Sequence, residues 1–162
     1  MKVYRLCRKE EIFSILKNKN FEDVGQECIQ DETINSHKYI EGKKYLHFFP
    51  NFDDLLYLNT TEGHYICTYD IPDNILDKTK GIGKYVDFIK FMNLVDIEEY
   101  AIETSSLDIK NLLCVFKIEK FIDYEDLWFD RSLKGFIRPV YIQNQQKITP
   151  EATSEPEPPL AL

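Results

Sequence analysis

The order of apolar and polar residues predicts a strand and then a helix at the start of the chain. Residues 3–8 form a short, mostly apolar run with strand-forming side chains. In residues 9–18, Ile12, Ile15 and Leu16 recur at the spacing of one helix face. Two glutamates in the first turn and a lysine in the last complement the helix dipole. We therefore expect a strand over 3–8 and a helix over 9–18.

The same patterns predict a series of short elements farther along. Residues 64–71 give the clearest strand, because Tyr65, Cys67 and Tyr69 alternate with more polar side chains. Gly81-Ile82-Gly83 is interpreted as a flexible joint, and residues 85–95 fit a helix, although 85–91 fit a strand equally well. The other expected strands are 43–49, 98–102, 112–118 and 136–142, and the other expected helices are 52–57, 73–76 and 124–129.

Residues 1–146 are expected to form one α+β domain. Strands outnumber helices and show no regular strand–helix–strand alternation, which disfavours a doubly wound parallel sheet. Residues 18–42 are polar, have no clear period and are predicted to be a long loop. Residues 149–162 hold four of the seven prolines, three glutamates and no aromatic residue. A segment of this composition cannot offset its ordering entropy, so 147–162 is expected to be a disordered tail.

Composition and charge exclude several classes of protein. Apolar residues make up 43% of the chain and aromatic residues 14%, which excludes a wholly disordered protein. The net charge of −8 disfavours general nucleic-acid binding. No apolar run approaches the roughly 20 residues that span a bilayer, and the N-terminus lacks a signal peptide, so we expect a cytoplasmic protein that does not contact membranes. The four cysteines and three histidines show no zinc-site spacing, so no metal is expected.

Six segments within residues 3–118 follow one another in a distinctive order. They are Tyr4-Arg5-Leu6, residues 11–16, the strand of 42–49 that begins Gly42-Lys43, the short helix of 52–57, the strand of 65–72 that closes in Asp70-Ile71-Pro72, and Glu98-Glu99-Tyr100-Ala101-Ile102. Their order and spacing resemble the ADP-ribosyltransferase-like fold of bacterial toxins and effectors. The resemblance implies a small, mostly antiparallel split sheet with short flanking helices.

The resemblance also implies a substrate, NAD, and a set of residues that contact it. Arg5 on the first strand would grip the pyrophosphate, because a planar guanidinium binds phosphate oxygens in bidentate fashion. Glu99 would hold the ribose 2′-OH and face the oxocarbenium charge that develops when the nicotinamide–ribose bond breaks. Glu98 is the alternative, because a shift of one residue in register exchanges the two faces of a strand.

The middle strand would supply the remaining contacts to NAD. His47 would hydrogen-bond ribose or backbone, and Tyr45 or Phe49 would stack on nicotinamide. This strand has no serine, so the resemblance fixes neither the subtype nor the acceptor, which is a protein or a nucleic acid. A partner protein that neutralises a toxin is also implied.

Two other functions remain open. The chain fits a non-catalytic module of the same fold that binds a nucleotide or a protein, and it fits a structural or interaction domain from a phage or mobile element. In those cases Arg5 pairs with a surface carboxylate, and Glu98 and Glu99 are solvated residues of a strand.

Overall fold

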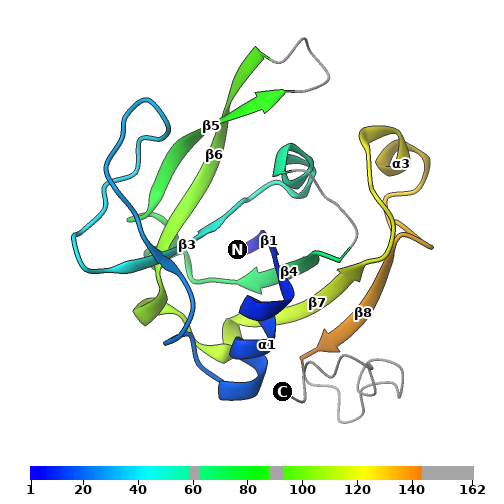
Figure 1. Cartoon of the computed structure of the whole chain (residues 1–162), viewed down its shortest axis with the longest axis horizontal. Helices are drawn as coiled ribbons and strands as arrows, with labels where there is room; N and C mark the ends of the chain where they lie inside the picture. Colours follow the sequence, from blue (N-terminus) through cyan, green and yellow to red (C-terminus); the bar gives the residue numbers. More distant parts are fainter. Residues whose placement is uncertain (59–62, 88–92, 144–162) are drawn as a thin grey trace.

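Two four-stranded sheets form the framework of the protein (Figure 1). The computed structural model describes residues 1–58, 63–87 and 93–143. One sheet has the strand order β1-β4-β7-β8 and the other β2-β3-β6-β5, and all of these neighbours are antiparallel. The strands are β1 (Lys2–Cys7), β2 (Gln26–Glu27), β3 (Lys44–Phe48), β4 (Tyr65–Asp70), β5 (Lys80–Asp87), β6 (Asn93–Glu103), β7 (Leu112–Ile118) and β8 (Ile137–Ile142).

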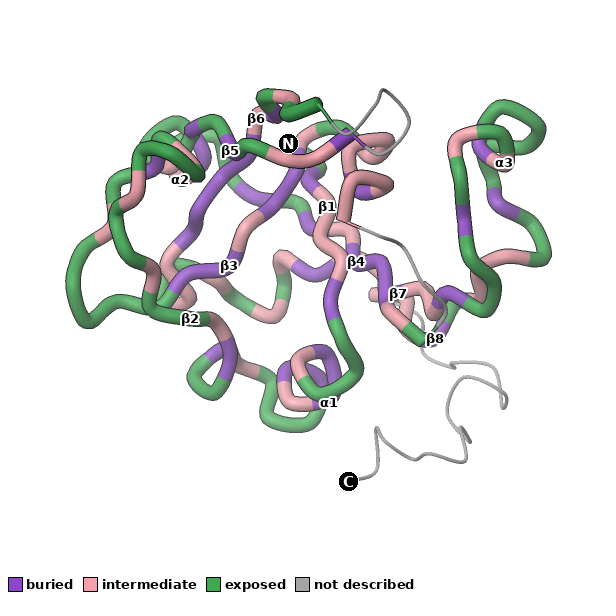
Figure 2. Tube along the Cα trace, turned by 45° about the horizontal axis from the view of Figure 1, so that its top comes forward, coloured by how far each residue is buried: buried purple, intermediate pink, exposed green. Residues whose placement is uncertain are grey.

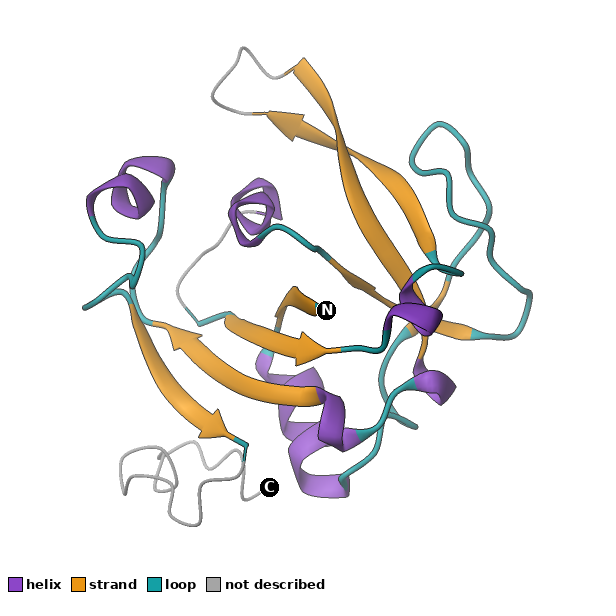
Figure 3. Ribbon diagram, turned by 180° about the vertical axis from the view of Figure 1, so that it is seen from behind, coloured by secondary structure: helices purple, strands orange, loops and turns teal. Residues whose placement is uncertain are grey.

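The helices in the described part of the chain are short and lie around the sheets (Figure 3). They are α1 (Lys9–Asn18), α2 (Asp73–Leu76), α3 (Tyr124–Phe129) and the 3-10 helices η1 (Phe52–Leu58), η2 (Thr104–Ser106) and η3 (Ile109–Asn111). The predicted class, a mixed α and β fold with mostly antiparallel strands and few helices, is confirmed. None of the described helices combines the length and the apolar character that a membrane span requires.

The helix α1 has the bounds that its sequence predicts. Its predicted apolar residues Ile12, Ile15 and Leu16 are buried, and Phe13 joins them. The helix ends where Lys19 adopts a left-handed conformation (φ 60°) and donates its backbone N–H to the carbonyl of Ile15. This capped last turn leads directly into the long loop before β3.

The two sheets are joined where β1 meets the end of β3. Tyr4 and Phe49 exchange two backbone hydrogen bonds, each 2.8 Å long. Beyond this pair the strands diverge, with β1 continuing beside β4 and β3 beside β6. Within the described residues, the two antiparallel sheets are thus linked by this single bridge, one residue before Arg5.

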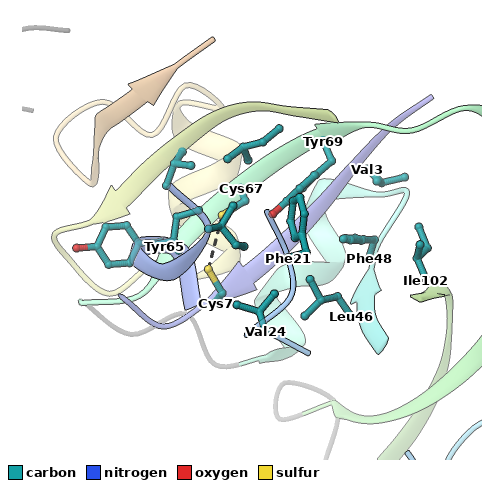
Figure 4. Close-up of a cluster of buried hydrophobic side chains, with 14 of the residues drawn as sticks. Val3, Cys7, Phe21, Val24, Leu46, Phe48, Tyr65, Cys67, Tyr69 and Ile102 are labelled. Carbon is teal, nitrogen blue, oxygen red and sulfur yellow. Dashed lines mark hydrogen bonds between the residues drawn. The ribbon is translucent and has the colours of Figure 1, made fainter. Parts of the chain in front are cut away.

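Buried side chains lie on both faces of β4, so the core has two parts. Figure 4 shows the larger cluster, in which the Phe48 and Tyr69 rings lie 4.8 Å apart between centroids and Cys67 packs alongside. Ile66 points the opposite way, into a second cluster that includes Ile118. Purple, buried segments therefore run through the central strands in Figure 2, and green, exposed segments form the periphery. The central position of β4 explains its apolar sequence.

Four details differ from the sequence predictions. Gly81-Ile82-Gly83 is part of strand β5 rather than a joint, because these glycines make room for side chains that cross the sheet face, as described below. The helix considered over 85–95 is wrong in its described part, because 85–87 belong to strand β5 and 93–95 to strand β6. Strand β6 is also longer than the predicted strand over 98–102, and it pairs with β5. The helix α3 is present, but Trp128 and Phe129 are exposed and only Leu127 is buried.

Other expectations lie outside the described residues. These include the disordered tail at 147–162 and the aromatic residues of 88–92. Within the described part, Pro139 lies in β8, an edge strand, where a missing N–H is tolerated.

Candidate functional site

A cleft of about 600 Å³ lies where the two sheets separate. Its walls come from β1, the start of α1, β3, β5 and β6. Four of the predicted site residues line it together: Arg5, His47, Phe49 and Glu99. The strand pairings explain why these residues meet. Tyr4 of β1 pairs with Phe49, next to Arg5. In the pairing of β3 with β6, Phe48 lies opposite Tyr100, so the next residues in register are Phe49 and Glu99.

Tyr45, another predicted contact, lies in an adjoining pocket of about 460 Å³ rather than in the main cleft. Arg5 and His47 line both cavities, so the two are neighbours. The Tyr45 ring is buried and meets Tyr39 edge-on at 5.0 Å, and its hydroxyl accepts a hydrogen bond from the backbone N–H of Ile40 (2.9 Å). Through these contacts Tyr45 supports the loop before β3.

Glu98 and Glu99 point to opposite faces of β6. Glu98 is 41% exposed and lies 3.4 Å from the Lys80 ammonium, and it also accepts a hydrogen bond from the Tyr100 hydroxyl. Glu99 is only 2% exposed and lines the cleft. The structure therefore places Glu99, and not Glu98, in the cleft that Arg5 also lines.

Arg5 is held in a fixed orientation by two partners. Its Nε and Nη2 donate to the two carboxylate oxygens of Glu11 at 2.7 and 2.6 Å, and its Nη1 donates to the carbonyl of His47 at 3.1 Å. Burial opposes the guanidinium charge, but the hydrogen bonds and charge of Glu11 outweigh it and raise the pKa of Arg5. These bonds use three of the five N–H groups of a guanidinium.

Glu99 is fixed by a tyrosine from the neighbouring strand. The Tyr85 hydroxyl donates to Oε2 of Glu99 at 2.6 Å. Burial, followed by the charge of Glu99, raises the pKa of Tyr85, so this phenol stays protonated and remains a donor. The other oxygen, Oε1, lies 3.3 Å from Nε2 of His37.

The glycines of β5 leave room for the side chains of Glu99 and His37 to pack directly against the strand. A Cβ at Gly83 would collide with the Glu99 carboxylate, and a Cβ at Gly81 would lie 2.5 Å from Nδ1 of His37. The loop that carries His37 is pinned to the outer edge of β5, where Ser36 and Ile82 are joined by a backbone hydrogen bond of 2.9 Å. The loop thus closes one side of the site.

His47 is neutral at physiological pH. Burial lowers the pKa of His47 to about 4, although the charge of Glu99 opposes this shift. Its Nε2 lies 2.6 Å from the Tyr39 hydroxyl. A neutral imidazole can accept a hydrogen bond or bind a metal ion, and it adds no positive charge to the cleft.

Sequence reasoning missed three residues of this site, His37, Tyr39 and Tyr85. The first two lie in a loop without a periodic pattern, and only the tertiary fold brings them to the sheet. Tyr85 follows Gly81 and Gly83 at the two-residue spacing of one strand face. Glycine at alternate strand positions indicates that other groups approach the strand closely. This spacing is the sequence signal that could have identified the strand face on which Tyr85 lies.

The cleft combines charges of both signs. Arg5, Arg8 and Lys84 contribute positive groups, and Glu11 and Glu99 are among the negative ones. A cleft that holds a buried carboxylate and a fixed guanidinium suits a ligand that carries both an anionic part and a part that becomes cationic during reaction. Comparisons with protein-family models, curated proteins and solved structures find no match to the chain. The chemistry of the cleft is therefore the basis for assigning a function.

Neutral His47 predicts a specific dependence of stability on pH. In the unfolded chain a histidine has a pKa of about 6.5, so between about 6.5 and 4 the unfolded state binds a proton that the folded state does not. The contribution of His47 to the free energy of unfolding should fall as the pH decreases through this window, by up to about 1.4 kcal/mol for each pH unit. Urea unfolding at several pH values measures the slope.

The matched variant for this measurement is His47→Gln, which has no titratable group at this position. Its stability should change less steeply between pH 6.5 and 4 than that of the wild type. Equal slopes for the two proteins would show that His47 titrates normally in the fold.

Proposed function

We propose that this protein is an NAD-dependent ADP-ribosyltransferase with an ADP-ribosyltransferase-like fold, acting also as an NAD glycohydrolase when water is the acceptor. One observation carries the proposal. The guanidinium of Arg5 and the carboxylate of Glu99 come from distant parts of the chain and line the same cleft. The convergence of a cation and a carboxylate in one cleft supports this chemistry.

Arg5 binds the pyrophosphate of NAD in this proposal. Among the described residues, Glu11 and the His47 carbonyl engage three of its N–H groups, so one N–H on each terminal nitrogen remains for phosphate oxygens. Glu11 acts as a positioning residue, because its bidentate contact holds the guanidinium plane. The nearby cations Arg8 and Lys84 attract the anionic ligand.

Glu99 stabilises the transition state. The bond between C1′ of the ribose and the nicotinamide nitrogen breaks, and its electron pair leaves with nicotinamide, which becomes neutral. Positive charge then develops on the ribose, and the carboxylate of Glu99 holds the 2′-OH and faces this charge. The acceptor oxygen or nitrogen attacks C1′ and loses its proton. Because Tyr85 already fixes Oε2, little reorganisation is needed at the moment of reaction.

The apolar part of the cleft suits the nicotinamide ring. The Phe49 and Tyr85 rings meet at 62° with 5.7 Å between their centroids. An aromatic wall next to Glu99 would hold the planar leaving group and keep water away from the reacting bond. The acceptor is a protein or a nucleic acid, and a neutralising partner would act by covering this opening.

A non-catalytic nucleotide-binding module is the second candidate. The observation that favours it is the engagement of Arg5 by Glu11 and by the His47 carbonyl, which completes much of its hydrogen bonding without a ligand. Such a module would bind NAD without breaking it.

Incubation with NAD distinguishes these functions. The enzyme should release nicotinamide and transfer labelled ADP-ribose to a component of a cell lysate. A binding module should be stabilised by NAD in thermal unfolding but release no nicotinamide. Neither effect would be seen with a purely structural domain, and that result would overturn the proposal.

A further inference from the structure

Three side chains with metal-binding atoms meet beside the cleft. They are His37 from the loop before β3, His47 from β3 and Glu99 from β6. One ligand atom from each lies within 4.8 Å of the corresponding atoms of the other two. No sequence motif covers this set, because the three residues come from separate segments, which explains why the sequence predicts no metal site.

His37 has an unusual environment for a buried histidine. Its side chain is 1% exposed, and within the described residues its Nε2 makes no hydrogen bond. This nitrogen lies 3.3 Å from Oε1 of Glu99, but the two atoms approach outside hydrogen-bond geometry. A buried polar atom without a partner costs free energy, so it calls for an explanation. A third atom bound by both groups would provide one.

The spacing of these atoms fits the edge of a metal coordination shell. Zinc binds imidazole nitrogen and carboxylate oxygen at about 2.0–2.1 Å, so two ligands of a tetrahedral ion lie about 3.4 Å apart. The His37–Glu99 distance of 3.3 Å matches this edge. The ligand atom of His47 lies within 4.8 Å of those of the other two residues, so it would complete the set by a shift of about an ångström or more toward them.

We propose that His37, His47 and Glu99 bind a divalent ion of the zinc type, with the fourth coordination position open toward the cleft. Two imidazoles and one carboxylate are a ligand set that zinc uses in sites with an open position.

The surroundings of the site hold the ligands in place. The His37 ring rests against Gly81, Tyr85 binds the second carboxylate oxygen of Glu99, and Tyr39 contacts the His47 ring. Partners of this kind orient metal ligands and raise affinity. They also limit the number of positions that the three side chains can adopt.

Metal binding at this site would affect the proposed reaction. The ion would occupy the carboxylate oxygen that faces the ribose, so zinc and NAD would compete for Glu99. Binding of the ion itself does not rest on the proposed function, and it is measured without NAD.

Titration of the metal-free, full-length protein with Co²⁺ tests the proposal. We expect one equivalent of Co²⁺ to produce the visible absorption bands of a tetrahedral ion, and Zn²⁺ to abolish them by displacement. His37→Ala, His47→Ala and Glu99→Gln should each weaken binding by at least about tenfold. Thermal unfolding of each variant checks that it is folded, and Glu99→Gln preserves the shape of the site.

Two control variants keep the test specific. His64→Ala removes a histidine that lines the same cleft but lies outside the cluster, and Cys28→Ser removes a nearby thiol. Both should bind Co²⁺ as the wild type does. The proposal fails if the wild type gives no tetrahedral spectrum, or if the spectrum survives in all three ligand variants. Nicotinamide release in the presence of a chelator is measured separately, so failure of the metal site and failure of the enzyme are distinguishable.

Discussion

Glu99→Gln is expected to lower the rate of nicotinamide release by roughly 10²–10³-fold. The substitution keeps the size and shape of the side chain and removes the negative charge that faces the ribose in the proposed reaction. Because Gln retains a carbonyl oxygen, it still accepts the hydrogen bond from Tyr85, and the fold should persist. Nicotinamide release under saturating NAD measures the effect, and thermal unfolding checks the fold.

Glu98→Gln is the matched control for this prediction. It makes the same chemical change one residue earlier on β6, at a side chain that is 41% exposed and faces away from the cleft. Its activity should stay close to that of the wild type. Equal losses in both variants, or a loss confined to Glu98→Gln, would remove Glu99 from the reaction.

Gly83→Ala should disable the same site by a different route. Its added methyl group would collide with the Glu99 carboxylate and press on the Tyr85 ring, so both side chains must move. Overpacking of this kind costs about 1–3 kcal/mol in the free energy of unfolding. Displacement of a preorganised carboxylate by about 1 Å should also reduce turnover by roughly 10²-fold. Urea unfolding and nicotinamide release measure the two effects.

Ile82→Ala is the control that shows the effect of a substitution in strand β5 away from Glu99. Ile82 lies between the two glycines but is 37% exposed, on the face away from Glu99. This variant should lose little stability and little activity. A Gly83→Ala protein with wild-type turnover would show that the position of Glu99 does not limit the reaction.

Local patterns explain why the first part of the fold was predictable. The helix at 9–18 has its charge distribution and its apolar spacing within ten residues, and the structure reproduces both bounds. The strand at 64–71 was predicted from alternation, and Tyr65, Cys67 and Tyr69 are buried in the same cluster. In both elements the residues that decide the structure are neighbours in sequence.

Long-range contacts explain what the sequence did not reveal. Glycine usually indicates flexibility, but Gly81 and Gly83 have a steric role that depends on His37 and Glu99, which lie far away in sequence. Trp128 and Phe129 are large aromatic residues, yet the α3 helix presents them to solvent beside its acidic residues.

The candidate site could be predicted in part from the sequence, and the rest depends on long-range contacts. Arg5, His47 and Glu99 were predicted to converge from the order of the segments that carry them, and all three line the cleft. The choice between Glu98 and Glu99 could not be made from sequence, because it depends on the register between β3 and β6. His37 escaped notice because a loop brings it to the site.

In the proposed reaction, Arg5 and Glu99 act on one dinucleotide. A crystal structure of the Glu99→Gln protein with NAD tests it most directly, since this variant should bind the substrate without consuming it. We predict that the pyrophosphate lies within hydrogen-bond distance of the Arg5 guanidinium and that the nicotinamide ribose contacts residue 99. NAD bound elsewhere, or in this cleft with its pyrophosphate away from Arg5, would contradict the account.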